Sequence, residues 1–259
     1  MTTALDDHAD FARALADEAG ALASRYFRRE LAYTCEAKGP QDWVSEADRE
    51  VEALVRARLR SAYPDDAVFG EEAGGAMGAR TWLVDPIDGT LNFVHGVRYW
   101  CVSIALVEHG IPMVGVIADP ANGETYWAMR GRGAWCNERR IAVSGCSDVE
   151  QALVTAGFVA RHTLGRYHAL HGALVAAGAA VKDMGAGALM LAHVAAGRYD
   201  GYIEPHMYPW DATAGLLLVQ EAGGRTRPYP GRDGWAAGGA VLASAPALYA
   251  RLDAIAASA

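Results

Sequence analysis

The chain of 259 residues is 52% hydrophobic, enough to build a substantial core in one domain or in two closely packed halves. Its formal net charge of -8 is spread without a basic stripe, which argues against a nucleic-acid surface, although a metal ion can still draw an anionic substrate into an acidic pocket. Four cysteines without CxxC spacing, an acidic amino-terminal segment and no apolar run of ~18 residues predict a soluble cytoplasmic protein without a membrane segment.

Two amphipathic helices are predicted at the start of the chain. Apolar residues recur at helical spacing over 5–27 and again over 51–59. Ser45 and Asp48, three residues apart, resemble a capping box at the start of the second helix. Between the helices, the sequence Lys-Gly-Pro-Gln-Asp-Trp at 38–43 contains a Gly-Pro pair and predicts a loop whose residues could face a site.

Short strands are expected next, followed by an alternating second half. Turn signals separate strand-like segments at 67–69, 81–84, 99–107, 111–118 and 124–129, of which the last three predict consecutive antiparallel strands. In the second half we expect strands at 152–155, 199–204 and 240–243, helices at 167–177, 188–196 and 212–221, and a carboxyl-terminal helix. A meander followed by alternating elements predicts a layered α/β architecture with two sheets.

The sequence Asp-Pro-Ile-Asp-Gly-Thr at 85–90 is the most informative segment, because an apolar strand ends there in two acids. Pro86 restricts the backbone, so the turn can direct the carboxylates of Asp85 and Asp88 toward one point. The carbonyl oxygen of Ile87 can face the same point. Hard oxygen ligands of this kind suit Mg²⁺.

A phosphate cradle could follow directly after these acids. If a helix starts near Thr90, the backbone amides of Gly89 and Thr90 are available to an anion at its amino terminus. The alternative is an ordinary turn in which Asp88 or Thr90 caps a helix.

Two further acidic positions have similar surroundings. Glu71 and Glu72 follow the strand-like segment 67–69, although adjacent glutamates are more often a solvated surface pair. Asp211 precedes an apolar helix, where its ordinary role would be that of an N-cap. An N-cap carboxylate can still offer its other oxygen to a metal ion.

These segments together resemble the inositol monophosphatase family. The resemblance rests on Gly-Glu-Glu at 70–72, Asp-Pro-Ile-Asp-Gly-Thr at 85–90, and Trp-Asp at 210–211 followed by Ala214-Gly215, and it runs from Lys38 to at least Gly224. It implies a layered α-β-α-β-α sandwich of the inositol monophosphatase and fructose-1,6-bisphosphatase type. One domain would span 1–259, with an amino-terminal α+β half at about 1–145 and a carboxyl-terminal α/β half at about 146–259.

The resemblance also implies a cluster of two to three Mg²⁺ ions. Glu71, Asp85 and the Ile87 carbonyl would hold one ion. Asp85, Asp88 and Asp211 would hold a second, and a third would depend on Glu71 and water. Clustered metal ions suit phosphate-ester hydrolysis, because they activate water and neutralise the charge of the phosphate.

A catalytic set is implied beside the metal ligands. In the family, an acid matching Asp48 bonds a threonine matching Thr90, and with the glutamate matching Glu71 they orient the attacking water. Lys38 and Asp42 would come from a mobile loop before the second predicted helix, which contains Asp48. The implied catalytic residues are thus Glu71, Thr90, Asp48 and Lys38, and the phosphate-binding residues are Asp88, Gly89 and Thr90.

The resemblance implies substrate contacts in the second half, at Gly187 within the segment 185–188 and at Glu204. His206 is a further candidate, because it is close enough to Asp211 in the sequence to reach the pocket. Family members usually carry a Ser-Ala-Ala type segment where this chain has Ala-Gly-Ala at 186–188, so the match weakens there. Alternatively, Gly187 allows close helix packing, Glu204 ends a surface strand, and His206 is a structural histidine.

The expected function is magnesium-dependent hydrolysis of a small polyol or sugar phosphate monoester, with inositol monophosphate as the first candidate. Histidinol phosphate, other sugar phosphates and nucleotide phosphates are alternatives, as is a non-catalytic regulator. The sequence lacks GxSxG, HExxH and Walker A motifs. Apart from a small-molecule substrate, family analogy suggests a homodimer inhibited by lithium, with no nucleic-acid or membrane partner.

Overall fold

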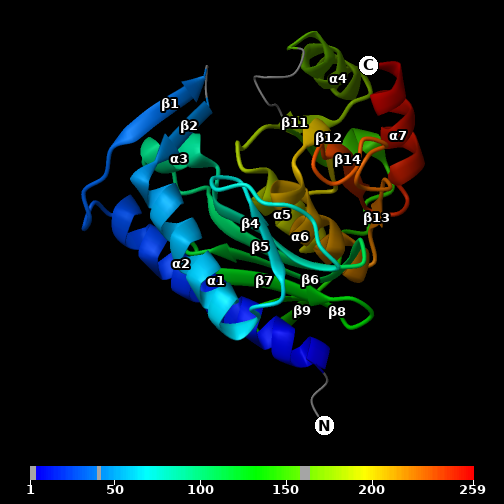
Figure 1. Cartoon of the computed structure of the whole chain (residues 1–259). Coiled ribbons are helices and arrows are strands. Elements are labelled where there is room, and N and C mark those ends of the chain that lie inside the picture. Colours follow the sequence, from blue (N-terminus) through cyan, green and yellow to red (C-terminus); the bar gives the residue numbers. More distant parts are fainter. Residues whose placement is uncertain (1–3, 40–41, 158–163) are drawn as a thin grey trace.

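The computed structural model describes residues 4–39, 42–157 and 164–259 (Figure 1). Its helices are α1 (Ala4–Phe27), α2 (Glu46–Ala62), α3 (Thr90–Val94), α4 (Leu164–Ala176), α5 (Gly187–Ala195), α6 (Pro209–Glu221) and α7 (Tyr249–Ser258), with a 3-10 helix at Val149–Gln151. Its strands are β1 (Cys35–Gly39), β2 (Asp42–Ser45), β3 (Ala67–Gly70), β4 (Arg80–Asp88), β5 (Cys101–Glu108), β6 (Ile111–Asp119), β7 (Glu124–Met129), β8 (Gly133–Cys136), β9 (Arg139–Ile141), β10 (Leu153–Ala156), β11 (Ala180–Lys182), β12 (Gly201–Met207), β13 (Arg225–Thr226) and β14 (Gly239–Ser244).

Five layers follow one another in the order α-β-α-β-α (Figure 1), which confirms the predicted sandwich. Helices α1 and α2 cover one face of a seven-stranded sheet with the order β3-β4-β5-β6-β7-β8-β9. Helices α5 and α6 lie between this sheet and a five-stranded sheet with the order β11-β10-β12-β14-β13. Helices α4 and α7 cover the outer face of the second sheet.

Strand β5 shows why the central strands are apolar throughout. Its side chains alternate between two cores: Val102, Ile104 and Leu106 face the layer of α1 and α2, and Cys101, Ala105 and Val107 face α5 and α6. Because a shift by one residue would exchange the two faces, burial on both sides helps to fix the register. In that register Asp85 of β4 lies opposite Ser103 of β5.

Glycines let helix α6 approach its neighbours closely. A Cβ atom on Gly115 of β6 would lie 2.8 Å from the carbonyl oxygen of Ala214, and one on Gly215 would overlap Leu191 of α5. Neither glycine has a positive φ, so close packing rather than backbone conformation explains them. The middle of α6 is thereby held close to β6 on one side and to α5 on the other.

The loop expected at 38–43 was only partly right. Strands β1 and β2 pair antiparallel there, with Cys35 opposite Ser45, while residues 40–41 lie outside the described part. The described residues of the expected loop therefore belong to two short paired strands. Strand β4 also continues past the expected end at 84, through a register shift between Asp85 and Asp88. No described helix is both long and apolar enough to span a membrane.

Candidate active site

Two parallel strands deliver the first two acids of the site. Strands β3 and β4 pair in parallel with Gly70 opposite Val84, and the Glu71 amide donates to the Val84 carbonyl at 3.1 Å. Because the carboxyl ends of parallel strands share one edge of the sheet, the next residue of each strand leaves at the same place. Those residues are Glu71 and Asp85, so the acids converge without being near in sequence.

The third acid comes from the other half of the chain. Tyr208 is the N-cap of α6 and Asp211 lies in its first turn, so the alternative that Asp211 is an N-cap is wrong. The Ser103 hydroxyl donates to the Trp210 carbonyl at 2.9 Å, which ties the start of α6 to the strand that pairs with Asp85. This contact places Asp211 over the end of β4.

The three carboxylates form a group that suits a hard cation. Oxygens of Glu71, Asp85 and Asp211 lie within 4.8 Å of one another. Only 1% of the Asp85 surface is exposed, and burial, followed by the charges of Glu71, Asp211 and Asp88, raises the pKa of Asp85 well above its usual value. Buried like charges repel strongly unless they share protons or a cation. Their oxygen donors match the ligand preference of Mg²⁺.

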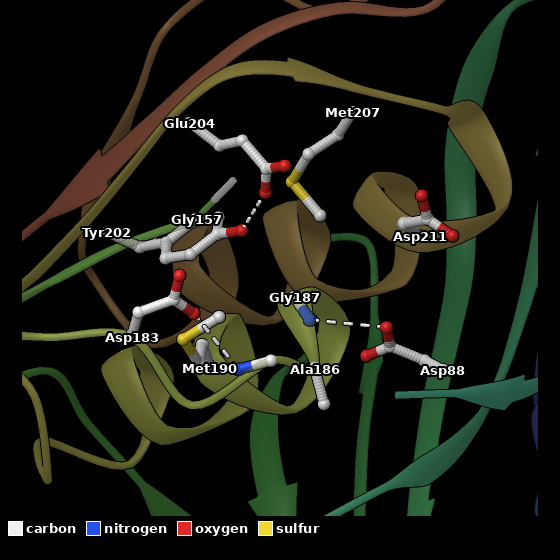
Figure 2. A pocket seen from close by; sticks show the side chains of 11 residues that line it. Asp88, Gly157, Asp183, Ala186, Gly187, Met190, Tyr202, Glu204, Met207 and Asp211 are labelled. Carbon is white, nitrogen blue, oxygen red and sulfur yellow. Dashed lines mark hydrogen bonds between the residues drawn. The ribbon is translucent and has the colours of Figure 1, made fainter. Parts of the chain in front are cut away.

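Asp88 connects the two halves of the site. Its carboxylate accepts backbone N–H groups at the start of α5, from Gly187 at 3.2 Å, Ala188 at 2.8 Å and Leu189 at 3.4 Å, of which Figure 2 draws the first. Burial raises the pKa of Asp88 to about 6, although these bonds and the Cys101 thiol oppose the shift. The alternative that Asp88 caps the helix next to it is wrong, since its partners belong to α5.

Helix α3 begins at Thr90, as the sequence suggests, and its N-cap is Gly89 in the left-handed conformation with φ of 89°. The Thr90 hydroxyl lies 3.3 Å from Oδ1 of Asp48 and 3.1 Å from the Ile87 carbonyl oxygen. The bond between Asp48 and Thr90 is the one that the resemblance implies. Roles for Gly89 in phosphate binding and for the Ile87 carbonyl in metal binding stay predictions.

Asp48 also completes the capping box that the sequence predicts. It accepts the Ser45 backbone N–H at 2.8 Å, while the Ser45 hydroxyl accepts the Asp48 amide. Burial raises the pKa of Asp48 to about 6, against the lowering effect of the Ser45 hydrogen bonds. One buried acid thus starts helix α2 and orients Thr90.

A cavity of about 160 Å³ lies beside these acids. Figure 2 shows Asp88 and Asp211 on one side and Tyr202 with Glu204 on the other. Glu204 is only 5% exposed and accepts the Tyr202 hydroxyl, so the alternative of a surface strand end is wrong. Burial raises the pKa of Glu204 well above its usual value. Gly187 both lines the cavity and packs closely, since its Cβ would lie 2.7 Å from the Met207 methyl group.

Some of the expected site residues are placed elsewhere. His206 is not among the residues that line this cavity; its Nε2 lies 2.7 Å from the Ala237 carbonyl oxygen and its ring meets Tyr208 edge-on. The side chains of Lys38 and Asp42 lie outside the described residues. Their catalytic and substrate roles stay predictions.

The cavity is also lined by Gly185 and Ala186, which belong to the segment that the resemblance places near the substrate, and by five residues that were not expected from the sequence: Gly157, Asp183, Met190, Tyr202 and Met207. Most are small or apolar residues whose types carry no chemical signal. Asp183 could have been noticed as an acid two residues before Gly185, but its place at the cavity depends on how the second sheet packs.

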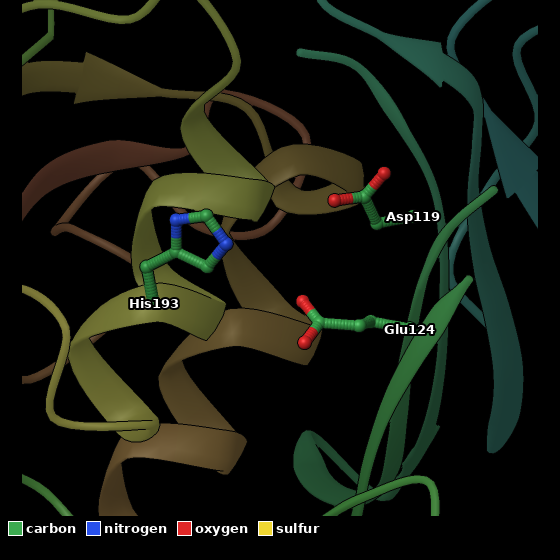
Figure 3. A group of neighbouring side chains, drawn as sticks. All are labelled: Asp119, Glu124 and His193. Atoms are coloured by element: carbon green, nitrogen blue, oxygen red, sulfur yellow. The ribbon is translucent and has the colours of Figure 1, made fainter. Parts of the chain in front are cut away.

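A second group of possible ligands lies apart in Figure 3, where Asp119, Glu124 and His193 converge. Here a side chain already supplies the positive charge. Arg198 donates to both carboxylate oxygens of Glu124, lowers its pKa to about 2, and lies 3.3 Å from Nε2 of His193. Burial lowers the pKa of His193 to about 4. Glu124 is therefore already paired with a cationic side chain.

Comparisons with known proteins agree with the geometry. The model of the inositol monophosphatase family matches residues 4–258. "Nus factor SuhB" of Pseudomonas aeruginosa is 42% identical over 225 residues, covering 83% of each chain, and "Inositol-1-monophosphatase" of Rhizobium meliloti is 41% identical over 192 residues, covering 72% of each. The solved inositol monophosphatase of Anabaena sp. PCC 7120 has a TM-score of 0.86 at 33% identity, covering 99% of this chain and 97% of that one.

Proposed function

Because the chain belongs to the inositol monophosphatase family, we propose that it hydrolyses the phosphate monoester of a small polyol or sugar in a magnesium-dependent reaction. Inositol monophosphate is the first candidate substrate. The observation that carries the proposal is the convergence of Glu71, Asp85 and Asp211 beside a cavity lined by further acids. We extend it to a cytoplasmic homodimer that binds two to three ions.

The residues present fit magnesium. Glu71, Asp85 and Asp211 would hold it, with Asp88 and the Ile87 carbonyl as further oxygen ligands. A bound cation would offset the burial and the like charges that raise the pKa of Asp85. When bound, magnesium would neutralise the charge of the phosphate oxygens and make water a stronger nucleophile.

The chain's own side chains would align the reactants. An ionised Asp48 accepts a hydrogen bond from the Thr90 hydroxyl. The lone pairs of the Thr90 oxygen can then accept a hydrogen bond from the attacking water, which would fix the orientation of that water. Across the cavity, the Tyr202 hydroxyl positions Glu204 by a hydrogen bond. Glu204 can also accept hydrogen bonds from the hydroxyl groups of a polyol. The α5 amides would keep the Asp88 carboxylate in place at the edge of the cavity.

A substrate panel with and without Mg²⁺ tests the proposal. Purified protein would be given inositol monophosphate, histidinol phosphate, fructose bisphosphate and a nucleotide 3'-phosphate, and released phosphate would be measured in Mg²⁺ or in EDTA. We expect Mg²⁺-dependent release, fastest from inositol monophosphate. A strong preference for histidinol phosphate would overturn the inositol assignment, and no release from any ester would contradict the phosphatase itself.

A second candidate function comes from the names of relatives. The Pseudomonas aeruginosa protein is named a Nus factor, so we propose a role in transcription as the alternative or additional activity. A strain lacking the chain would be compared with one carrying Asp85→Asn. If the deletion alters transcription and Asp85→Asn does not, the regulatory role is independent of catalysis. If transcription is unchanged in both strains, this second proposal fails.

A further inference from the structure

Glu52 is a buried acid outside the proposed metal site. It lies in α2, only 1% exposed, and its carboxylate accepts the backbone N–H of Glu72 at 2.7 Å and of Ala73 at 3.0 Å. Nε of Arg56 donates to the same carboxylate at 2.6 Å. A buried charge is tolerated when it is paired and hydrogen-bonded in this way. The two backbone N–H groups that Glu52 binds belong to the turn that follows Glu71.

Arg56 binds the other end of the same turn, at Gly74. Its guanidinium donates to the Gly74 carbonyl and lies 3.4 Å from the Val68 carbonyl of β3. The Gly74 carbonyl also accepts the Gly70 amide at 3.1 Å, which closes the turn. The ion pair therefore holds the strand end, both sides of the turn and helix α2 in one arrangement.

Gly70 makes room for this ion pair. A Cβ atom at Gly70 would lie 2.7 Å from the carboxyl carbon and from Oε1 of Glu52. The φ of Gly70 is not positive, so the glycine is needed for the approach of the carboxylate and not for an unusual backbone conformation. The glycine of the Gly-Glu-Glu motif and the acid in α2 thus form one structural unit.

We propose that Glu52 is a positioning residue that sets the place of the metal ligand Glu71. The inference rests on the proposed function. Glu71 is held on one side by its own amide bond to the Val84 carbonyl and on the other by the Glu52 bond to the next amide, that of Glu72. Residues that orient metal ligands through hydrogen bonds typically change metal affinity by about 10–100-fold when they are replaced.

Glu52→Gln tests this with little change in size. The amide NH₂ group cannot accept an N–H, so at least one turn amide loses its acceptor and Arg56 loses its counter-charge. We expect the dissociation constant for Mg²⁺, measured by calorimetry, to rise at least about 10-fold. In metal-free protein, hydrogen exchange of the amides at 71–74 should be faster. At saturating Mg²⁺, kcat should change less than the Mg²⁺ requirement.

Asp66→Asn is the matched control. Asp66 is also an acid near β3 whose side chain is only 2% exposed, and its partners, Arg80 at 2.6 Å and the Trp82 indole at 2.8 Å, lie in β4 and not in the turn. We expect a loss of thermal stability with unchanged Mg²⁺ affinity. Equal loss of Mg²⁺ affinity in both variants would overturn the proposal, because general destabilisation would then explain it.

Gly70→Ala is the second variant, in case Glu52→Gln does not fold. Displacing the carboxylate should weaken Mg²⁺ binding and expose the turn amides in the same way. Wild-type Mg²⁺ affinity in a folded Glu52 or Gly70 variant would refute the positioning role. If the wild-type chain binds Mg²⁺ yet hydrolyses no ester, the phosphatase proposal fails while the positioning role is still decided by calorimetry and hydrogen exchange.

Discussion

A hydrogen bond joins the carboxyl groups of Asp85 and Asp211, although Asp85 lies in strand β4 of the first sheet and Asp211 in the first turn of helix α6. Two carboxylates can share such a bond only if one carries a proton. A cation bound to both carboxylates would offset their like charges in the same way as a shared proton.

Replacing either of these acids by asparagine should abolish Mg²⁺-dependent hydrolysis. Asp85→Asn and Asp211→Asn remove ligand charge at constant size, and we expect kcat/KM to fall at least about 100-fold. In EDTA the Asp85 variant should be at least as stable as the wild type, since a neutral amide avoids both the burial of a charge and the repulsion by neighbouring acids that raise the pKa of Asp85. Phosphate release and urea denaturation measure the two effects. Unchanged activity in both variants would rule out the site.

Stability should depend on pH through Asp48. Its pKa rises from 3.8 to about 6 on folding, so the native state holds the proton more tightly than the unfolded state. The stabilisation from protonation is complete below about 3.8 and is lost as the pH rises through about 6, an effect of roughly 2–3 kcal/mol. Urea denaturation in EDTA between pH 4 and 6.5 should show this fall, and Asp48→Asn should flatten it. Equal slopes would contradict the assignment.

Filling the cavity should weaken substrate binding without weakening metal binding. In Gly187→Ala the new methyl group would lie 2.7 Å from the Met207 methyl group and 3.0 Å from the Tyr202 hydroxyl. We expect KM to rise about 10-fold, a loss of about 1.4 kcal/mol, with the half-saturating Mg²⁺ concentration unchanged. Gly172→Ala in α4 is the control, because nothing lies near its Cβ, and it should leave KM unchanged. Steady-state kinetics would decide; equal KM in both variants would exclude the cavity as the substrate site.

The contact between β6 and α6 should be sensitive to a single methyl group. In Gly115→Ala the added Cβ would lie 2.8 Å from the Ala214 carbonyl oxygen and 2.9 Å from its Cα, so backbone must move. Overpacking of this kind typically costs about 1–3 kcal/mol. The free energy of unfolding in urea measures the loss, with Gly172→Ala as a substitution expected to stabilise by about 0.5–1 kcal/mol. A fully stable Gly115 variant would show that α6 can shift freely.

The predictable parts of the fold are those with a long, regular pattern. The helices at α1 and α2 and the strands β5 to β7 each repeat their apolar spacing over several turns or pairs, so local sequence is enough to assign them. Strands β8, β9, β11 and β13 have only two to four residues, too few for a period to show. They depend on pairing with neighbours that are fixed by the rest of the fold.

The convergence of the acids of the proposed metal site could be anticipated because acids after strand-like segments are chemically conspicuous, but the residues that support them could not. Glu52 looks in sequence like any acid on an amphipathic helix, and only the approach of the turn after β3 shows that it is buried. The bonds from the α5 amides to Asp88 likewise join segments of different halves. Such contacts depend on how layers pack, which no local pattern encodes.

The origin of the acids in both halves has a consequence for assembly of the site. A piece of the chain ending near residue 145 would contain Glu71, Asp85 and Asp88 but not Asp211, and the remaining piece would contain Asp211 alone. Neither piece alone contains all the proposed ligands. A cation that binds only when the pieces are together would therefore stabilise their association. Binding of the ion proposed for catalysis would then also be a measure of whether the two halves are associated.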